Sequence, residues 1–363
     1  MGHRPGAREP GGAGVGAVLR HAAGRPSVRD RVLRAALGQP VDTTPVWFLR
    51  QAGRYLPEYR RLRERYSLAQ LCREPELAAQ VTLQPLRRMD VDAAILFTDL
   101  LVPLWGMGLE FELAEGRGPV LPTPVPVDRL AQLPELDLEA VEFVPQTVRL
   151  VRAALDRPLV GFAGAPFTVA AYLVEGRPSR DWPRTRALLH SRPEVWHALA
   201  ARLTTNLAAY LRAQVQAGAQ LVQLFDSWVG VLSAEDFRWA VRPYLVQLLR
   251  TLDGVPRIYF ATGCAHLLAE FRDLPAEVVG VDWRVPLSEA AAVLGGKAIQ
   301  GNLDPARLLG DRQALRAEAS RIVAQGRVLR GHIFNLGHGV MPETDPDRLA
   351  ELVEWVHERG RRA

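Results

Sequence analysis

Short apolar segments recur along the chain, and segments with helical periodicity lie between them. Apolar runs of a few residues, rich in Val, Ile, Leu and Phe, are typical of strands buried on both faces. Eight such runs are present: Val46–Leu49, Ala93–Phe97, Leu159–Phe162, Leu221–Phe225, Arg257–Phe260, Val278–Val281, Ala298–Gln300 and His332–Leu336. Their alternation with helical segments predicts a parallel α/β sheet that is covered by helices.

Eight is the number of strands that closes a TIM (β/α)8 barrel. The 363 residues of the chain suffice for one barrel, and we predict a single domain over residues 27–363. An open, doubly wound sheet is the alternative. No Gly-x-Gly-x-x-Gly follows the first apolar run, and its absence weakens that alternative.

Two other segments have recognisable patterns. A long helix is predicted over Glu194–Ala217, because Pro193 suits its first turn and Gly218 suits its end. Residues 109–127 combine alternating residues with many glycines and prolines, which indicates a hairpin or loop inserted between the second and third strands.

The first predicted helix begins at Ser27, with Asp30 three residues later in a pattern that resembles a capping box, and it ends at Gly38. The residues before it, 1–26, are rich in Gly, Arg and Pro. They contain too little apolar surface to order themselves, so we predict a disordered extension. This extension also holds much of the positive charge, with four arginines against Glu9: Arg4, Arg8, Arg20 and Arg25.

Composition narrows the class of protein further. Hydrophobic residues make up 48% of the chain and charged residues 23%, as in ordinary soluble globular proteins. No apolar run approaches the roughly 20 residues of a membrane span. Residues 1–26 account for +3 of the net charge of +5 and the other 337 residues for about +2, so the high charge is no sign of the clustered basic face that a nucleic-acid partner needs. Only Cys72 and Cys264 are present, which favours a reducing, cytoplasmic compartment.

Polar residues follow the predicted strands at the point where each strand ends. In a TIM barrel the active site lies at this carboxyl end of the strands. No comparable polar set precedes the strands. The residues that follow them, and that we take as candidates for a cleft, are Arg50, Arg54, Thr98, Asp99, Tyr172, Ser227, Asp282, Asn302 and His338.

Each candidate also has a purely structural interpretation. Arg50 and Arg54 could form structural ion pairs. Asp99 could cap a helix, and Tyr172 could be a packed aromatic residue. Residues 226–227 could begin a helix, and residues 302–305 could form a turn and a cap. His338 is hardest to explain in this way, since flanking glycines do not require a histidine.

The amino-acid sequences of several segments resemble motifs of the uroporphyrinogen decarboxylase family. The resemblance runs without a gap from about residue 28 to the end of the chain, and two segments are long and specific: Phe48-Leu49-Arg50-Gln51-Ala52-Gly53-Arg54-Tyr55-Leu56-Pro57-Glu58-Tyr59 and Gly161-Phe162-Ala163-Gly164-Ala165-Pro166-Phe167-Thr168. Shorter segments follow in the family's order: Phe97-Thr98-Asp99, Phe225-Asp226-Ser227-Trp228, Gln300-Gly301-Asn302-Leu303-Asp304-Pro305 and Asn335-Leu336-Gly337-His338-Gly339.

This resemblance implies a TIM barrel that forms a homodimer with facing clefts and needs no metal or organic cofactor. It implies removal of carbon dioxide from the four acetate side chains of uroporphyrinogen III, which gives coproporphyrinogen III in haem biosynthesis. By matched position it places six residues in the cleft, with Asp99, Arg50 and Tyr172 as catalytic candidates: Arg50, Arg54, Asp99, Tyr172, Ser227 and His338.

The chemistry of these side chains suits such a substrate. The substrate has eight carboxylates on its rim and four pyrrole N–H donors at its centre. Arg50 and Arg54 can bind carboxylates with two hydrogen bonds each. Ionised Asp99 can accept pyrrole N–H bonds and stabilise a cation formed by protonation of the pyrrole. The proton donor is left open between Arg50, a bound water and a substrate carboxyl.

Three other functions fit parts of the sequence. A zinc-dependent corrinoid or thiol methyltransferase on the same barrel would carry His-x-Cys and a later Cys. Cys264-Ala265-His266 has the reverse order, and no cysteine follows it. A non-catalytic porphyrinogen carrier would have the same cleft, and only a turnover assay distinguishes it. A glycosidase with paired carboxylates is disfavoured, because most acids at the strand ends adjoin predicted helix caps.

Overall fold

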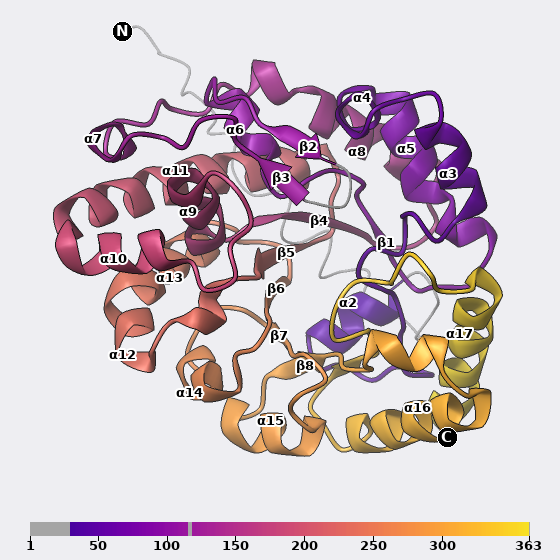
Figure 1. Ribbon diagram of the computed structural model, residues 1–363. Helices are drawn as coiled ribbons and strands as arrows, with labels where there is room; N and C mark the ends of the chain where they lie inside the picture. The colour runs from indigo at the N-terminus through magenta and orange to yellow at the C-terminus, as the bar shows by residue number, and fades with distance from the viewer. Residues whose placement is uncertain (1–29, 115–117, 363) are drawn as a thin grey trace, which may run out of the picture.

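A computed structural model describes residues 30–114 and 118–362 and has one central parallel sheet (Figure 1). In Figure 1 the strands lie at the centre of the molecule, and helices form a ring around them. The strands neighbour one another in chain order: β1 Ala94–Ile95, β4 Leu159–Gly164, β5 Leu221–Asp226, β6 Arg257–Ala261, β7 Val278–Gly280, β8 Ala298–Gln300 and β9 His332–Ile333. Each adjacent pair is parallel, as the sequence pattern predicts.

The eighth position of the barrel is filled by the segment around Val46. Val46 pairs in parallel with Phe334, whose N–H donates to the carbonyl of Pro45 at 2.8 Å. On the opposite edge, the N–H of Asp92 donates to the carbonyl of Val46 at 2.7 Å. The segment therefore lies between β9 and the start of β1, and it closes the barrel that the eight apolar runs predict.

This first segment is shorter than the predicted strand Val46–Leu49. Side chains take the backbone N–H groups that a regular ladder would use. Val46 donates to Asp92 at 2.8 Å, and Phe48 donates to Gln51 at 3.1 Å. Leu49 donates to Asn335 at 2.9 Å. Side-chain acceptors thus replace strand pairing after a single bridge, because buried N–H groups need some partner.

Helices connect the strands and cover the outside of the barrel. Several of them follow the rules of helix capping: Ser67 and Gln70 form a capping box at α4, and Asp311 caps α16. The α-helices are α2 Arg31–Ala36, α3 Pro57–Arg63, α4 Leu68–Arg73, α5 Pro75–Leu83, α6 Val102–Gly106, α7 Val127–Leu130, α8 Phe143–Ala154, α9 Pro166–Glu175, α10 Pro183–Ser191, α11 Pro193–Ala217, α12 Ala234–Asp236, α13 Arg242–Arg250, α14 Leu268–Phe271, α15 Leu287–Leu294, α16 Arg312–Gly326 and α17 Pro346–Gly360. A π-helix occupies Phe237–Val241, and short 3₁₀ turns occupy Pro85–Arg87, Glu139–Val141, Val229–Val231, Ala265–Leu267 and Pro305–Leu309.

The structure confirms the predicted long helix and the predicted hairpin. Helix α11 spans Pro193–Ala217 and ends at Gly218, whose φ of 124° suits glycine. Within the predicted insertion, β2 (Glu112–Ala114) pairs antiparallel with β3 (Gly118–Val120).

The predicted start of the first helix is wrong. Asp30 occupies the N-cap position of α2, rather than the third position of a helix that begins at Ser27. A carboxylate oxygen of Asp30 accepts a hydrogen bond from Nε of Arg34 at 2.8 Å, so this side chain is engaged one turn along the helix. The predicted end at Gly38 is confirmed by its φ of 68°. Ser27 and the predicted extension over residues 1–26 lie outside the described residues.

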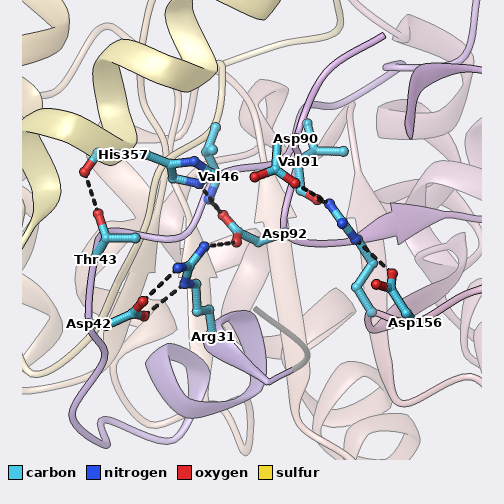
Figure 2. A network of polar contacts seen from close by, with 10 residues as sticks. Arg31, Asp42, Thr43, Val46, Asp90, Val91, Asp92, Asp156 and His357 are labelled. Atoms are coloured by element: carbon cyan, nitrogen blue, oxygen red, sulfur yellow. Dashed lines mark hydrogen bonds and ion pairs between the residues drawn. The ribbon is translucent and has the colours of Figure 1, made fainter. Parts of the chain in front are cut away.

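A buried carboxylate at the amino ends of the strands ties together four parts of the fold (Figure 2). Asp92 has no exposed surface and accepts hydrogen bonds from Arg31 at 3.0 Å and from the N–H of Val46 at 2.8 Å. The oxygen that accepts from Val46 also lies 2.7 Å from Nε2 of His357 on α17. The contacts join α2, the closing segment, β1 and the last helix. This face of a TIM barrel serves stability, whereas catalytic residues lie at the opposite, carboxyl end of the strands.

Candidate active site

The six predicted cleft residues all lie at the carboxyl ends of the barrel strands. Arg50 and Arg54 follow the closing segment, and Asp99 follows β1. Tyr172 lies on α9, which begins two residues after β4, and the other two follow β5 and β9: Ser227 and His338. The charge of Arg50 acts on the pKa values of Asp99, Tyr172 and His338, in agreement with their shared position at this rim.

Arg50 has a strained backbone and a guanidinium that none of the described residues binds. Its φ is 58°, a left-handed conformation that costs about 1–2 kcal/mol for a residue with a Cβ. Gln51 holds this turn: its side chain is fully buried and donates to the carbonyl of Ala93 at 3.0 Å. Within residues 30–114 and 118–362, the guanidiniums of Arg50 and Arg54 make no hydrogen bond or ion pair. The structural ion pairs considered above are therefore absent from the described chain, and both cations are available to an anion.

Asp99 is a partly buried carboxylate that follows the neighbouring strand, β1. Burial raises the pKa of Asp99 to about 6, against the opposing effects of the Leu101 N–H and of Arg50. One oxygen accepts from the N–H of Leu101 at 2.9 Å. Helix α6 has Leu101 at its N-cap position, so Asp99 forms a local turn and is not the helix cap. Its other oxygen has no hydrogen-bond donor among the described residues, and it can accept from a ligand.

Tyr172 belongs to an aromatic group that the sequence did not single out. Its ring centroid lies 5.3 Å from that of Trp182 and 6.2 Å from that of Trp228, and the two indoles are 4.8 Å apart. Burial, and then Asp99, raise the pKa of the Tyr172 hydroxyl, so it stays protonated as a donor. Trp182 is fully buried at a φ of 50°. No sequence signal marks it, because a tryptophan rarely adopts this conformation.

His338 lies between two glycines at which any side chain would collide with a neighbouring strand end. A Cβ on Gly337 would lie 2.5 Å from the backbone nitrogen of Trp283, and a Cβ on Gly339 would collide with the side chain of Arg50. Desolvation and the charges of Arg50 and Arg284 lower the pKa of His338, so its ring is neutral at pH 7 and can both donate and accept. Part of the residue is nevertheless exposed to solvent, so a ligand can reach it.

Ser227 follows a buried carboxylate that sequence analysis treated only as a helix start. Asp226 is the last residue of β5, and its two oxygens accept from the hydroxyls of Thr168 and Tyr259, each at 2.8 Å. Burial raises the pKa of Asp226 to about 6, and these hydrogen bonds oppose the rise. The helix-start interpretation is wrong, because Ser227 lies in a non-helical turn and the next helical turn, a 3₁₀ turn, begins only at Val229. The Asp226 network supports the strand end that presents Ser227.

Two further residues that follow a strand, Asn302 and Asp304, have structural partners. Asn302 is buried and donates to the carbonyls of Asp282 and Val285 at 2.9 and 2.6 Å. Asp304 accepts from the N–H of Ala306 at 3.0 Å, which confirms the predicted turn and cap. Asn302 therefore holds the loop after β7 in place rather than facing a ligand.

No group of three His, Cys, Asp or Glu side chains suited to a metal ion occurs in the part of the chain that the structure describes. The two residues that a methyltransferase would use have other contacts. Sγ of Cys264 lies 3.1 Å from the carbonyl of Thr262, and Nε2 of His266 lies 2.9 Å from the carbonyl of Leu232. None of the helices in the described ranges has the length and apolar character needed to span a bilayer.

The fold agrees with comparison to known proteins. The family described as uroporphyrinogen decarboxylase (URO-D) matches residues 27–359. Proteins named uroporphyrinogen decarboxylase are similar to the chain: that of Thermus thermophilus is 48% identical over 91% of this chain and 98% of its own length. Those of Streptomyces avermitilis and Frankia casuarinae are each 48% identical, over 93% and 98% of this chain and 97% of their own lengths. The chain belongs to the uroporphyrinogen decarboxylase family.

A solved structure supports the architecture by itself. A methyltransferase from Methanosarcina mazei superimposes with a TM-score of 0.73, covers 92% of this chain and 99% of its own, and is 23% identical. At that identity the likeness concerns the fold alone. The predicted TIM barrel is thus confirmed by the family and by the closed arrangement of the strands.

Proposed function

We propose that this protein is a carboxy-lyase that converts uroporphyrinogen III to coproporphyrinogen III by removing carbon dioxide from the four acetate side chains. Membership of the family and the cleft chemistry support the same reaction. The observation that carries the proposal is that Arg50 and Asp99 follow adjacent strands of the barrel at the same rim, each with unused hydrogen-bonding capacity. Among the described residues, the cation has no partner and the carboxylate keeps one oxygen free. A polyanion with N–H donors at its centre needs both.

In this proposal the arginines bind the rim of the substrate and Asp99 binds its centre. Arg50 and Arg54 each take a carboxylate, because a guanidinium matches the planar carboxylate geometry. Asp99, ionised above pH 6, accepts pyrrole N–H bonds. Ser227 and His338 contribute further hydrogen bonds. Tyr172 donates a hydrogen bond from its phenolic hydroxyl, which keeps its proton.

The reaction needs an electron sink at the pyrrole. A proton adds to the pyrrole carbon next to the acetate-bearing carbon, and the ring becomes an iminium-like cation. The bond between the acetate methylene and its carboxylate then breaks, carbon dioxide leaves, and its electron pair forms an exocyclic double bond that neutralises the ring. A second proton converts the methylene into a methyl group, and the ring releases the first proton. Asp99 stabilises the cationic stage as a fixed negative charge.

We also propose an assembly and a location for the protein. A homodimer with facing clefts is the proposed assembly, and sedimentation velocity at several concentrations tests it. A cytoplasmic location agrees with the state of the cysteines, since Cys72 and Cys264 are both buried and free.

The decisive experiment is incubation with uroporphyrinogen under reducing, anaerobic conditions. The products are oxidised, and the number of carboxyl groups on each porphyrin is counted by chromatography and mass spectrometry. Appearance of the four-carboxyl product supports the proposal. Recovery of the eight-carboxyl compound in tight complex with the protein would identify a carrier. Activity that is lost after dialysis against a chelator and restored by zinc would favour the methyltransferase alternative.

A further inference from the structure

The end of β7 brings a third arginine to the rim that holds Arg50. Asp282 lies two residues past the end of this strand, and its side chain is only 4% exposed. One of its oxygens accepts from the N–H of Gly263 at 2.6 Å and from Nη1 of Arg284 at 2.7 Å. The other accepts from the backbone N–H of Arg284 at 2.9 Å. Asp282 thus fixes both the backbone and the side chain of Arg284.

The guanidinium of Arg284 contacts Asp282 and Trp283, and its remaining edge is exposed to solvent. It lies over the ring of Trp283, with Cζ 4.2 Å from the ring centroid. The side chain remains 52% exposed. Its Nε and second Nη form no hydrogen bond with any residue that the structure describes. A guanidinium held by a carboxylate and an aromatic ring has already lost most of its rotamer freedom, so a ligand can bind its free edge at a low entropic cost.

The loop that carries His338 packs against both the Arg284 segment and Arg50. Gly337 packs against the backbone of Trp283, and Gly339 packs against the side chain of Arg50. The loop is therefore wedged between the two arginine-bearing strand ends. In agreement with this geometry, the charges of Arg50 and Arg284 both lower the pKa of His338, although desolvation is the larger cause. The strand ends that carry Arg50 and Arg284 therefore flank the loop of His338.

We propose that Arg284 is a third substrate-binding guanidinium, which takes a rim carboxylate of the porphyrinogen, and that Asp282 is its positioning residue. The inference rests on the proposed function and specifies how the substrate is held. Eight carboxylates surround the macrocycle, more than Arg50 and Arg54 can bind. Arg284 extends the line of cations past His338, so a carboxylate on that side of the macrocycle meets two fixed N–H donors.

The test replaces Arg284 and compares the effect with that of a matched arginine. Arg284→Gln keeps a polar chain of reduced length and removes the charge, whereas Arg284→Lys keeps the charge and loses the planar fork. The control is Arg316→Gln, since Arg316 also lies over a tryptophan, 4.9 Å from the centroid of Trp355, but on the outer helix α16. Steady-state kinetics with uroporphyrinogen and melting temperature are measured for each protein.

Arg284→Gln should raise KM about tenfold or more, as expected when one charge-assisted, two-point contact is lost. The value of kcat should change less than about threefold, because the contact binds the substrate equally well in the ground state and in the transition state. Arg284→Lys should fall between Gln and wild type. Arg316→Gln should match wild type. A KM for Arg284→Gln equal to that of Arg316→Gln overturns the proposal. So does a fall in melting temperature with KM unchanged, which would make Arg284 purely structural.

A double-mutant cycle tests the role of Asp282. Asp282→Asn should raise KM through loss of the ion pair, and combining it with Arg284→Gln should add little, because the two residues act through one contact. Fully additive effects would show that Asp282 does not act through Arg284. Binding of the oxidised, non-reactive uroporphyrin, followed by tryptophan fluorescence, keeps this test separate from turnover. Wild-type protein that binds uroporphyrin yet makes no product would contradict the proposed decarboxylation while leaving the binding role of Arg284 measurable.

Discussion

Gly339 and Arg50 are packed so closely that no side chain fits between them. A Cβ on Gly339 would lie 2.7 Å from Cγ and 3.0 Å from Nε of Arg50, and closer still to Cδ. The φ of Gly339 is not in the left-handed region, so its backbone would accept alanine. The glycine is required by the position of the Arg50 stem, and hence by the position of its guanidinium.

Gly339→Ala should therefore lower activity more than stability. The Arg50 stem is flexible enough to move aside, which keeps the cost to folding near about 1 kcal/mol or below, but it carries the guanidinium away from its bound position. We expect kcat/KM to fall about tenfold or more, measured by the rate of coproporphyrinogen formation. Gly310→Ala is the matched control, because the nearest atom to its new Cβ is a carbonyl oxygen 3.6 Å away. Equal activity of the two variants would mean that the position of Arg50 does not matter.

Removing the charge of Asp99 should remove most of the turnover. Asp99→Asn keeps the size of the side chain and the acceptor for Leu101, but it cannot oppose a cationic intermediate. A preorganised charge of this kind contributes a factor of about 10²–10³ to turnover. Asp99→Glu keeps the charge and moves it by about one bond, so it should retain more activity than Asn. Initial rates are compared after circular dichroism confirms folding. A folded Asn variant with wild-type rates would reduce Asp99 to a turn residue.

The same substitution should stabilise the protein at neutral pH. An aspartate in an unfolded chain titrates near about pH 4, while the pKa of folded Asp99 is about 6. Between these values the folded chain binds more protons than the unfolded chain, so the contribution of Asp99 to stability decreases as pH rises from about 4 to about 6. At pH 7 the folded protein has an unfavourable buried charge, which Asn lacks. We expect Asp99→Asn to raise the free energy of unfolding by roughly 1–3 kcal/mol at pH 7.

Urea unfolding at pH 7 and pH 4 measures that difference. The gain from Asn should shrink at pH 4, where wild-type Asp99 is protonated in the folded state. Other groups titrate in both proteins alike, so only the difference between them is interpreted. An Asn variant that is less stable than wild type at both pH values would show that the Asp99 carboxylate is favourably solvated after all.

Residues 1–26 should be dispensable. Their Gly-, Pro- and Arg-rich composition cannot bury much apolar surface, and they precede the Asp30 cap of α2. Deleting them should leave melting temperature and activity nearly unchanged. A fall of more than about 5 °C, which corresponds to well over about 1 kcal/mol in a domain of this size, would show that the segment packs on the barrel.

The sequence alone predicted the order of the strands and the edge of the barrel at which the candidate residues meet. Both follow from local chemistry. Buried strands such as β5 are marked by short apolar runs, and long helices such as α11 by their caps. Because parallel strands all run in one direction, residues that follow successive strands meet at one edge. Arg50 and Asp99 could therefore be placed together, although they lie far apart in the sequence.

Tertiary contacts determine the features that the sequence did not predict. Only the folded chain shows that Val46 closes the barrel with one bridge, since the acceptors that shorten the strand come from residues as distant as Asn335. Only burial by the surrounding protein raises the pKa of Asp99, and only the fold shows Arg50 without a partner among the described residues. The position of Arg284 beside His338 depends on packing between strand ends far apart in sequence. Local patterns encode which residues are apolar or capped, but charge, desolvation and unfilled hydrogen-bonding capacity depend on neighbours that tertiary structure supplies.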